Sequence, residues 1–223
     1  MAERGRSIVI EGNDGTGKST QVELLSEWLK EDYGIDSLTI HEPDGPGISS
    51  AIRTVIKNGH LERDATTNLL LFSASRHESN RLGERALANG EWLLKARDWS
   101  STVAYQGGGE GLDSEYIRKV TEEFTTPLYM QPDLKVILAL GDNIRGERIA
   151  QRGPLDNPDT FEIRGNDFQQ RVNTAYLSIA EHEGYPVLDA SQSIEQVQAE
   201  IITLILAKGF LAHSPRMRSR KRQ

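Results

Sequence analysis

The sequence predicts an α/β fold with a parallel sheet, and three observations support this prediction. Short apolar runs alternate with helical patterns along the chain, which is the order that builds a parallel sheet with helices on both faces. A glycine-rich loop, residues 12–17, stands between the first apolar run and the first helical pattern. The 223 residues contain no internal repeat and no linker that would split them, so one domain with a sizeable core is expected.

Five apolar segments are expected to form the strands. The first begins the chain's ordered part with the β-branched run Ile8, Val9 and Ile10. The run DLKVILAL is the most apolar, and a strand buried on both faces has this composition, so it is predicted to be central in the sheet. The predicted strands cover residues 7–11, 36–41, 91–96, 133–140 and 186–190.

Helical patterns fill the segments between the strands. The first helix follows the glycine loop directly and ends at Tyr33-Gly34, since glycine is common just after a helix. Asp64 is placed to cap the longest helix at its N-terminus. The predicted helices cover residues 18–32, 48–57, 64–89, 99–106, 113–125, 143–151, 167–182 and 194–208.

The predicted topology gathers distant segments at one edge of the sheet. Right-handed crossovers place the carboxyl ends of all parallel strands on the same side, and ligands bind along that side. We therefore expect Glu11, the loop at residues 42–45, Arg97 and the residues after Leu140 to lie close together.

Composition excludes several classes of protein. The net charge of -7 argues against general nucleic-acid binding. The absence of cysteine excludes a disulfide scaffold and suits a reducing cytosol. No apolar run has the length of a membrane span, and the N-terminal MAERGRS lacks the apolar core of a signal peptide. A cytoplasmic protein without a membrane or specific nucleic-acid partner is therefore expected.

The two ends of the chain differ from the predicted domain. Residues 1–6 are expected to form an N-terminal extension, residues 7–210 a single domain, and residues 211–223 a basic, disordered tail. A solvated tail is the simpler interpretation of its arginines, and a weak contact with a phosphate polymer is the alternative.

The glycine loop has the Gly-x-x-x-x-Gly-Lys-Ser pattern of a P-loop. Its glycines let successive backbone N–H groups point at an anion, and the following helix adds its N-terminal dipole. Lys18 would supply a positive charge to the β- and γ-phosphates of a nucleoside triphosphate, and the Ser19 hydroxyl would bind Mg²⁺. A simple glycine turn is the alternative interpretation, and a P-loop alone could serve a GTPase, an ATPase or a kinase. The predicted phosphate-binding residues are Gly12, Asn13, Asp14, Gly15, Thr16, Gly17, Lys18, Ser19 and Thr20.

Four stretches make the prediction more specific. They are GNDGTGKSTQ at residues 12–21, Glu42-Pro43-x-Gly45 followed by Ala51-Ile52-Arg53, Leu69-Leu70-Leu71-Phe72-x-Ala74-x-Arg76, and Arg97 with Ser101-Thr102-x-Ala104-Tyr105-Gln106-Gly107. With these stretches, the chain resembles the thymidylate kinase family from about residue 7 to about residue 206. The resemblance implies a P-loop kinase fold with a short lid, and transfer of the γ-phosphoryl of ATP to dTMP. It also implies a homodimer packed through helices, among them the helix at 64–89.

The resemblance also implies an acceptor pocket. Phe72 would stack on thymine, whose flat face suits an aromatic ring, and Arg76 would donate to a thymine carbonyl. Tyr105 would favour deoxyribose. Guanidinium forks suit phosphate oxygens, so Arg53 and Arg97 would hold the monophosphate. The remaining implied contacts are Ser101, Thr102 and Gln106 at the base and Asp14 near the acceptor's sugar and phosphate.

A lid at about residues 145–164 is implied as well. Thr16 stands where some relatives carry a P-loop arginine, so the arginines that neutralise the transferring phosphoryl would come from the lid, at Arg148 and Arg152. Glu162 resembles the acid of the family's Asp-Arg-x-Glu element and is a second candidate metal ligand. Without the resemblance, the lid arginines could equally lie on a solvated helix surface.

Two departures from the family pattern leave alternatives open. Ala96 replaces an aspartate before Arg97, and Ala139 replaces an aspartate at the end of the fourth strand. Asp98 and Asp142 are nearby acids that could substitute. The chain could be a divergent kinase with relocated acids, a kinase for another nucleoside monophosphate or a deoxynucleoside, or a nucleotide-binding regulatory module with weakened catalysis.

Overall fold

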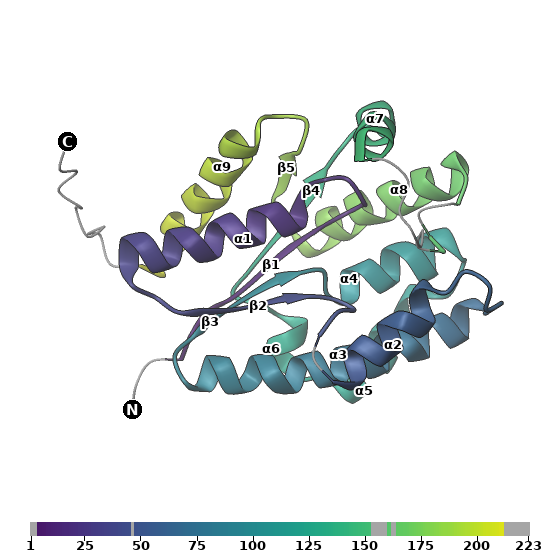
Figure 1. The fold of residues 1–223 in the computed structure, drawn as a ribbon, viewed down its shortest axis with the longest axis horizontal. Helices are drawn as coiled ribbons and strands as arrows, with labels where there is room; N and C mark the ends of the chain where they lie inside the picture. Colours follow the sequence, from purple (N-terminus) through teal and green to yellow (C-terminus); the bar gives the residue numbers. More distant parts are fainter. Residues whose placement is uncertain (1–3, 46, 153–159, 162–163, 212–223) are drawn as a thin grey trace.

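The computed structural model describes residues 4–45, 47–152, 160–161 and 164–211. Five strands form one parallel sheet in the order β2-β3-β1-β4-β5 (Figure 1). This confirms the predicted α/β fold. The strands are β1 (Ser7–Gly12), β2 (Ser37–His41), β3 (Trp92–Ala96), β4 (Leu134–Ala139) and β5 (Val187–Asp189).

The strand β1 occupies the middle of the sheet. Ile8 pairs with Leu94 on one side and with Leu134 on the other. The most apolar strand, β4, lies between β1 and β5 and is buried along nearly its whole length. Its burial on both faces was predicted from composition, but it stands one place away from the centre.

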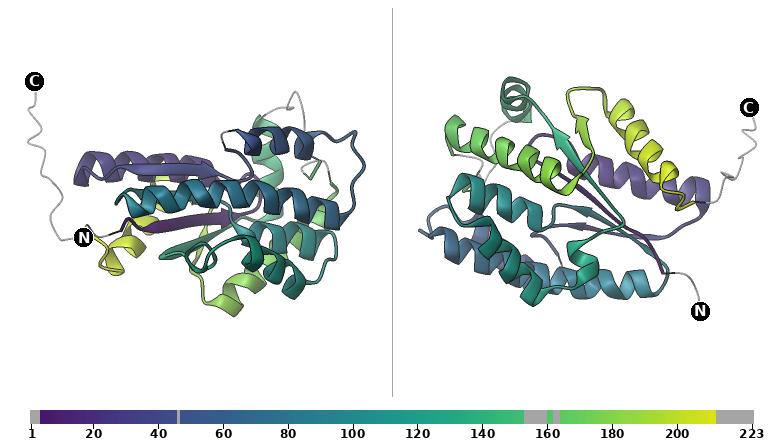
Figure 2. Two further views of the ribbon diagram at one scale, coloured as in Figure 1. Left: turned by 90° about the horizontal axis from the view of Figure 1, so that it is seen from below. Right: turned by 180° about the vertical axis from the view of Figure 1, so that it is seen from behind.

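Helices cover both faces of the sheet (Figures 1 and 2). One face packs against α1 and α9, with Leu25 and Ile201 in its core. The other packs against α3, α4 and α8, with Ile137 and Val172 in its core. The helices are α1 (Lys18–Trp28), α2 (Ile48–Lys57), α3 (Ala65–Ala88), α4 (Trp99–Thr102), α5 (Ser114–Phe124), α6 (Pro127–Met130), α7 (Asp142–Arg152), α8 (Asn166–Glu183) and α9 (Ile194–Ala207).

Two of the predicted helices continue into π-helical turns. The first helix becomes η1 (Leu29–Tyr33), and the helix expected at 99–106 is the short α4 followed by η2 (Val103–Gly109). In η2 the wider backbone spacing carries the chain through Gly107–Gly109, where helix propensity is low. Helix α6 was not predicted, although Thr126 caps it and Pro127 is its first residue, a recognised start signal.

The carboxyl ends of the strands bring the functional segments together. Asp64 caps α3 as predicted, accepting from the Thr67 N–H at 2.6 Å. At the end of β3 the chain turns sharply, because Arg97 has the left-handed φ of 78°.

Within the described ranges no helix has both the length and the apolarity that crossing a membrane requires.

Candidate active site

The P-loop connects β1 to α1 with three glycines at positive φ. Gly12 also lies against β4, where a Cβ atom would come 2.4 Å from the Leu138 carbonyl oxygen. Gly17 caps α1 without any side-chain hydrogen bond. The first N–H groups of α1 therefore lack the usual side-chain cap, which is the condition that suits an anion at a helix N-terminus.

The loop's polar side chains fold back onto the loop itself. Lys18 Nζ donates to the Asn13 carbonyl oxygen at 2.7 Å, and the Thr16 hydroxyl donates to the same oxygen at 2.9 Å. The Ser19 hydroxyl lies 3.2 Å from His41 Nδ1, while Thr20 is exposed. The side chain of Lys18, the first residue of α1, is buried. A phosphate bound at the N-terminus of α1 would therefore lie close to its positive charge.

Asp14 and Arg97 form an ion pair between the P-loop and the end of β3. Tyr105 OH donates to Asp14 Oδ2 at 2.8 Å and also lies 2.9 Å from Asn13 Oδ1. Burial alone would raise the pKa of Asp14, but the positive charges of Arg97 and Lys18 lower it below its usual value. Burial alone would lower the pKa of Arg97, whereas Tyr105 and Asp14 hold it well above its usual value.

Arg97 is also held by the opposite side of the site. Its Nη1 donates to the Ser101 hydroxyl at 3.2 Å and to Tyr176 OH at 3.3 Å. Ser101 in turn donates to the buried carboxylate of Glu11 at 2.9 Å. Burial and the neighbouring Asp98 raise the pKa of Glu11, and Arg97 opposes the rise. These groups fix the guanidinium at the carboxyl end of β1.

A small cavity of about 60 Å³ opens beside this ion pair. Phe72 forms one wall, and Phe161 faces it with ring centroids 6.0 Å apart. Typical ligand pockets are of the order of 300 Å³ or more, so the cavity is nearly closed in this state. Its other lining residues are Asp14, Pro43, Arg97, Ser101, Thr102, Tyr105 and Gln106.

Arg76 lies behind the cavity and is only 2% exposed. Its Nε donates to Tyr129 OH at 2.7 Å and to Glu42 at 3.2 Å, and its Nη2 donates to the Thr102 hydroxyl at 2.9 Å. The third nitrogen, Nη1, is buried without a partner among the described residues. An unpaired buried donor costs free energy, so this nitrogen is suited to a carbonyl oxygen of a ligand.

Two further predicted substrate residues take part in contacts within the protein. Gln106 Nε2 donates to Glu110 at 3.2 Å while its side chain lines the cavity. Arg53, on α2, is paired with Asp44 at 3.4 Å and does not line the cavity. The structure therefore brings six of the predicted acceptor residues, Phe72, Arg97, Ser101, Thr102, Tyr105 and Gln106, to the cavity, whereas Arg53 and Arg76 do not line it.

Asp98 does not replace the acid that is missing at Ala96. The left-handed turn at Arg97 directs the Asp98 side chain into the interior, where it pairs with Lys135 at 2.6 Å and caps α4. Burial alone would raise its pKa, but Lys135 and Lys95 lower it. Lys135 Nζ also lies 4.6 Å from the ring of Trp99. Ala96 itself is buried in the core against α1 and α9.

Asp142 lies beside the end of β4, where it lines a cavity of about 490 Å³ with Asn13, Ala139 and Asn173. Its carboxylate accepts from Asn173 Nδ2 at 2.5 Å, and Asn173 Oδ1 accepts from Asn13 Nδ2 at 2.8 Å. The acid near Ala139 therefore links the start of α7 to the P-loop through α8.

Helix α7 carries two arginines against the P-loop. Arg148 donates to the carbonyl oxygens of Gly15 and Ala190 at 3.3 and 2.8 Å. Arg145, one turn earlier, is 6% exposed and packs over Gly15. The side chain of Arg152 and all of Glu162 lie outside the described residues, as do residues 153–159 and 162–163 of the predicted lid and residues 212–223 of the predicted tail.

Sequence reasoning overlooked Arg145, Asn173 and Phe161. Arg145 precedes Arg148 by three residues, so both lie on one face of a helix, and this spacing was the available signal. Phe161 stands inside a polar, proline-broken segment, and nothing in its surroundings indicated a contact with Phe72.

The described residues contain no group of three or more histidines or acids arranged to hold a metal. Ser19, at the N-terminus of α1, is the described side chain that suits Mg²⁺ best, because Mg²⁺ in nucleotide sites takes few protein ligands and several phosphate oxygens. Asp14 is engaged by Arg97 and would have to be released first.

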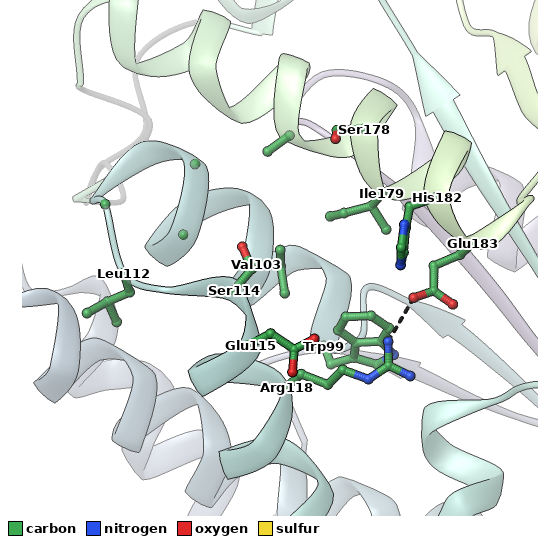
Figure 3. A pocket seen from close by; sticks show the side chains of 14 residues that line it. Trp99, Val103, Leu112, Ser114, Glu115, Arg118, Ser178, Ile179, His182 and Glu183 are labelled. Carbon is green, nitrogen blue, oxygen red and sulfur yellow. Dashed lines mark hydrogen bonds and ion pairs between the residues drawn. The ribbon is translucent and has the colours of Figure 1, made fainter.

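A separate cavity of about 390 Å³ lies on the far side of η2 (Figure 3). In this view Ile179 and His182 of α8 stand opposite Trp99 and Arg118, and Arg118 pairs with Glu183 at 2.9 Å. No P-loop residue lines it. It is therefore distinct from the cavity between Phe72 and Arg97.

Comparison with known proteins identifies similar chains along almost the whole length. A family model described as "Thymidylate kinase" matches residues 10–201. The thymidylate kinase of Chromobacterium violaceum is 38% identical over 202 residues, which cover 89% of this chain and 92% of the relative. That of Magnetococcus marinus is 37% identical, with 94% and 99% covered. The crystal structure of thymidylate kinase from Ehrlichia chaffeensis superposes with a TM-score of 0.71 at 25% identity, covering 91% and 99%.

Proposed function

This chain belongs to the thymidylate kinase family of phosphotransferases, and from that premise we propose that it transfers the γ-phosphoryl group of ATP to dTMP, giving dTDP and ADP. The observation that carries the proposal is the position of the Asp14–Arg97 pair. It lies between an anion site at the start of α1 and a cavity with an aromatic wall. A donor phosphate and an acceptor phosphate would meet there.

The donor is expected to be ATP with Mg²⁺. The backbone N–H groups at Gly17 and the start of α1 would hold the phosphates, and Lys18 would leave the Asn13 carbonyl to reach the β- and γ-phosphates. Ser19 would hold Mg²⁺, whose charge offsets that of the phosphate oxygens. Exchange of a neutral carbonyl acceptor for a charged one strengthens the hydrogen bonds of Lys18.

The acceptor dTMP would occupy the cavity beside Phe72. Thymine would stack on this ring, and Nη1 of Arg76 would find its missing acceptor in a thymine carbonyl. Arg97 would exchange Asp14 for the monophosphate. Because the cavity measures about 60 Å³, Phe161 has to move away from Phe72 before a nucleotide can enter.

Catalysis would then rest on position and charge. The acceptor phosphate is already anionic, so no strong general base is required. Lys18, Arg97 and the predicted lid arginines Arg148 and Arg152 would stabilise the charge on the transferring group, and exclusion of water would strengthen these contacts. The alanines at 96 and 139 remove two acids of the family pattern but leave the positive charges of Arg97 and Lys18 in place.

A chromatographic transfer assay tests the proposal. With ATP and Mg²⁺, the protein is expected to convert dTMP to dTDP faster than dUMP, UMP, CMP or thymidine. Equal rates for dTMP and UMP would contradict the roles of Phe72 and Tyr105. ATP binding by calorimetry without any dTDP would instead support a regulatory module.

We also propose a homodimer that works in the cytoplasm. Leu70 on α3 is 53% exposed, and Val55 on the adjacent α2 and Leu61 between the two helices are also exposed. Exposed apolar side chains of this kind gain free energy when a second copy covers them. Light scattering is expected to give twice the chain mass for the wild type and the single mass for Leu70→Glu. The same mass for the wild type and Leu70→Glu would contradict a dimer interface that includes Leu70.

A further inference from the structure

Arg145 is a buried arginine that the family resemblance does not assign to any role. It lies on α7, the helix that packs over the turn of the P-loop. Its Cγ comes 3.6 Å from the position that a Cβ atom on Gly15 would occupy. Only 6% of the residue is exposed. The guanidinium therefore begins within one side-chain length of the loop that holds the phosphates.

The guanidinium of Arg145 lacks partners. Its Nε and Nη1 are buried and make no hydrogen bond among the described residues. Arginine stays charged in proteins, and a buried charge without hydrogen bonds is unfavourable. The neighbouring Arg148 differs in this respect, because its nitrogens donate to the Gly15 and Ala190 carbonyl oxygens.

The charge of Arg145 acts on the centre of the site. It contributes to the lowered pKa of Asp14, after the larger effects of Arg97 and Lys18. The charges of three cations, Lys18, Arg97 and Arg145, therefore act on the Asp14 carboxylate. This excess of positive charge is the arrangement that attracts the terminal phosphates of a nucleoside triphosphate.

We propose that Arg145 binds the terminal phosphate of the nucleoside triphosphate, at the junction between the donor and acceptor phosphates. The inference deepens the proposed function and rests on it for the identity of the acceptor. Because Nε and Nη1 have no solvent access here, the side chain has to rotate about its own bonds to meet the phosphate. The two unpaired donors make that rotation favourable, since each gains a charged acceptor.

Replacement of Arg145 by methionine tests this assignment without an acceptor. By calorimetry, Arg145→Met is expected to bind ATP and inorganic tripolyphosphate about 10-fold more weakly, as a lost charged hydrogen bond implies. ADP affinity is expected to change less than about threefold, because ADP lacks the terminal phosphate. Arg145→Lys keeps the positive charge but lacks the guanidinium fork, so its ATP affinity should lie between those of the wild type and Arg145→Met.

A matched control separates this role from a structural one. Arg81→Met removes an exposed arginine on α3 that pairs with Glu78, and its nucleotide affinities should stay within about twofold of the wild type. The melting temperature of free Arg145→Met should be no lower than that of the wild type, since an apolar chain of similar length replaces an unpaired buried charge.

Two outcomes would overturn the inference. One is ATP affinity within about twofold of the wild type in Arg145→Met, which would leave the arginine a packing residue. The other is an equal loss for ADP and ATP, which would place the contact away from the terminal phosphate. A wild-type protein that binds ATP but fails to phosphorylate dTMP would overturn the proposed function and leave this inference standing.

Discussion

The acceptor side and the donor side of the site hold their charged groups in different ways. On the acceptor side, Arg97 is bonded to Asp14, Ser101 and Tyr176 before any ligand arrives. On the donor side, Arg145 has two unpaired nitrogens and the cap of α1 is open. At Arg97 an acceptor phosphate must therefore replace existing bonds, whereas at Arg145 a triphosphate would supply bonds that are missing. The contrast is between these two arginines, because Lys18 is already bonded to the Asn13 carbonyl oxygen and Nη1 of Arg76 has no partner among the described residues.

The largest expected effect comes from removing the donor-side lysine. Lys18→Ala is expected to lower kcat about 10³-fold, because the transferring phosphoryl loses a charge at its point of transfer. Steady-state rates in a coupled ADP-release assay measure this. Lys30→Ala, which removes an exposed lysine paired with Asp36, should keep the wild-type rate. Turnover of Lys18→Ala near that of Lys30→Ala would remove the donor side from the mechanism.

On the acceptor side, Arg97→Met should act on one substrate only. We expect kcat/KM for dTMP to fall about 10²-fold while KM for ATP changes by less than about threefold, since the guanidinium would contact the monophosphate. Initial rates at varied dTMP and varied ATP separate the two constants. A matching rise in KM for ATP would show that the two sides are not independent.

The hydrogen-bond chain from Asn13 through Asn173 to Asp142 links the P-loop to the start of α7, and a reciprocal exchange tests it. Asn173→Asp places two carboxylates at hydrogen-bond distance and should lower kcat about 10-fold. Adding Asp142→Asn restores one donor and one acceptor at this contact, so the double variant should recover most of the rate. If the double variant has a kcat no higher than that of Asn173→Asp alone, the contact between residues 142 and 173 does not position Asn13.

The smallest effect concerns stability and pH. Asp14 has a lowered pKa in the folded protein, so its ionised form stabilises the fold at pH values above its unfolded pKa, and this contribution is lost as pH falls through the folded pKa. Asp14→Asn should therefore melt roughly 2–4 °C below the wild type at pH 7. The difference should shrink below about pH 4. A difference that is constant from pH 7 to pH 3 would contradict the charge assignment.

Much of the fold could be read from residue patterns. The five strands were predictable because apolar, β-branched runs such as Ile8–Ile10 and LKVILA stand out from polar segments between them. The order of the strands needed tertiary packing, which placed β1 rather than β4 in the middle. The π-helical η2 was not predictable, because three successive glycines and a helical pattern have no single backbone solution.

The sequence predicts the site residues that belong to short local motifs, but it does not predict those whose direction depends on the backbone of a turn. The P-loop and the pocket residues from Phe72 to Gln106 follow from short patterns, and the structure brings most of them to one cavity. Asp98 could not be placed, since the left-handed backbone at Arg97 decides which way it faces. The unpaired state of Arg145 depends on which groups surround it, and sequence spacing carries no such information.

The buried pair of Lys135 and Asp98 beneath Trp99 gives the protein an optical reporter. Trp99 is one of three tryptophans, with Trp28 and Trp92 on other elements, and a cation lies 4.6 Å from its ring. Trp99 is two residues before Ser101, whose hydroxyl accepts a hydrogen bond from Arg97 and donates one to Glu11. Fluorescence from a chain with Trp28 and Trp92 changed to phenylalanine would therefore follow occupation of the acceptor side in real time, with no attached dye.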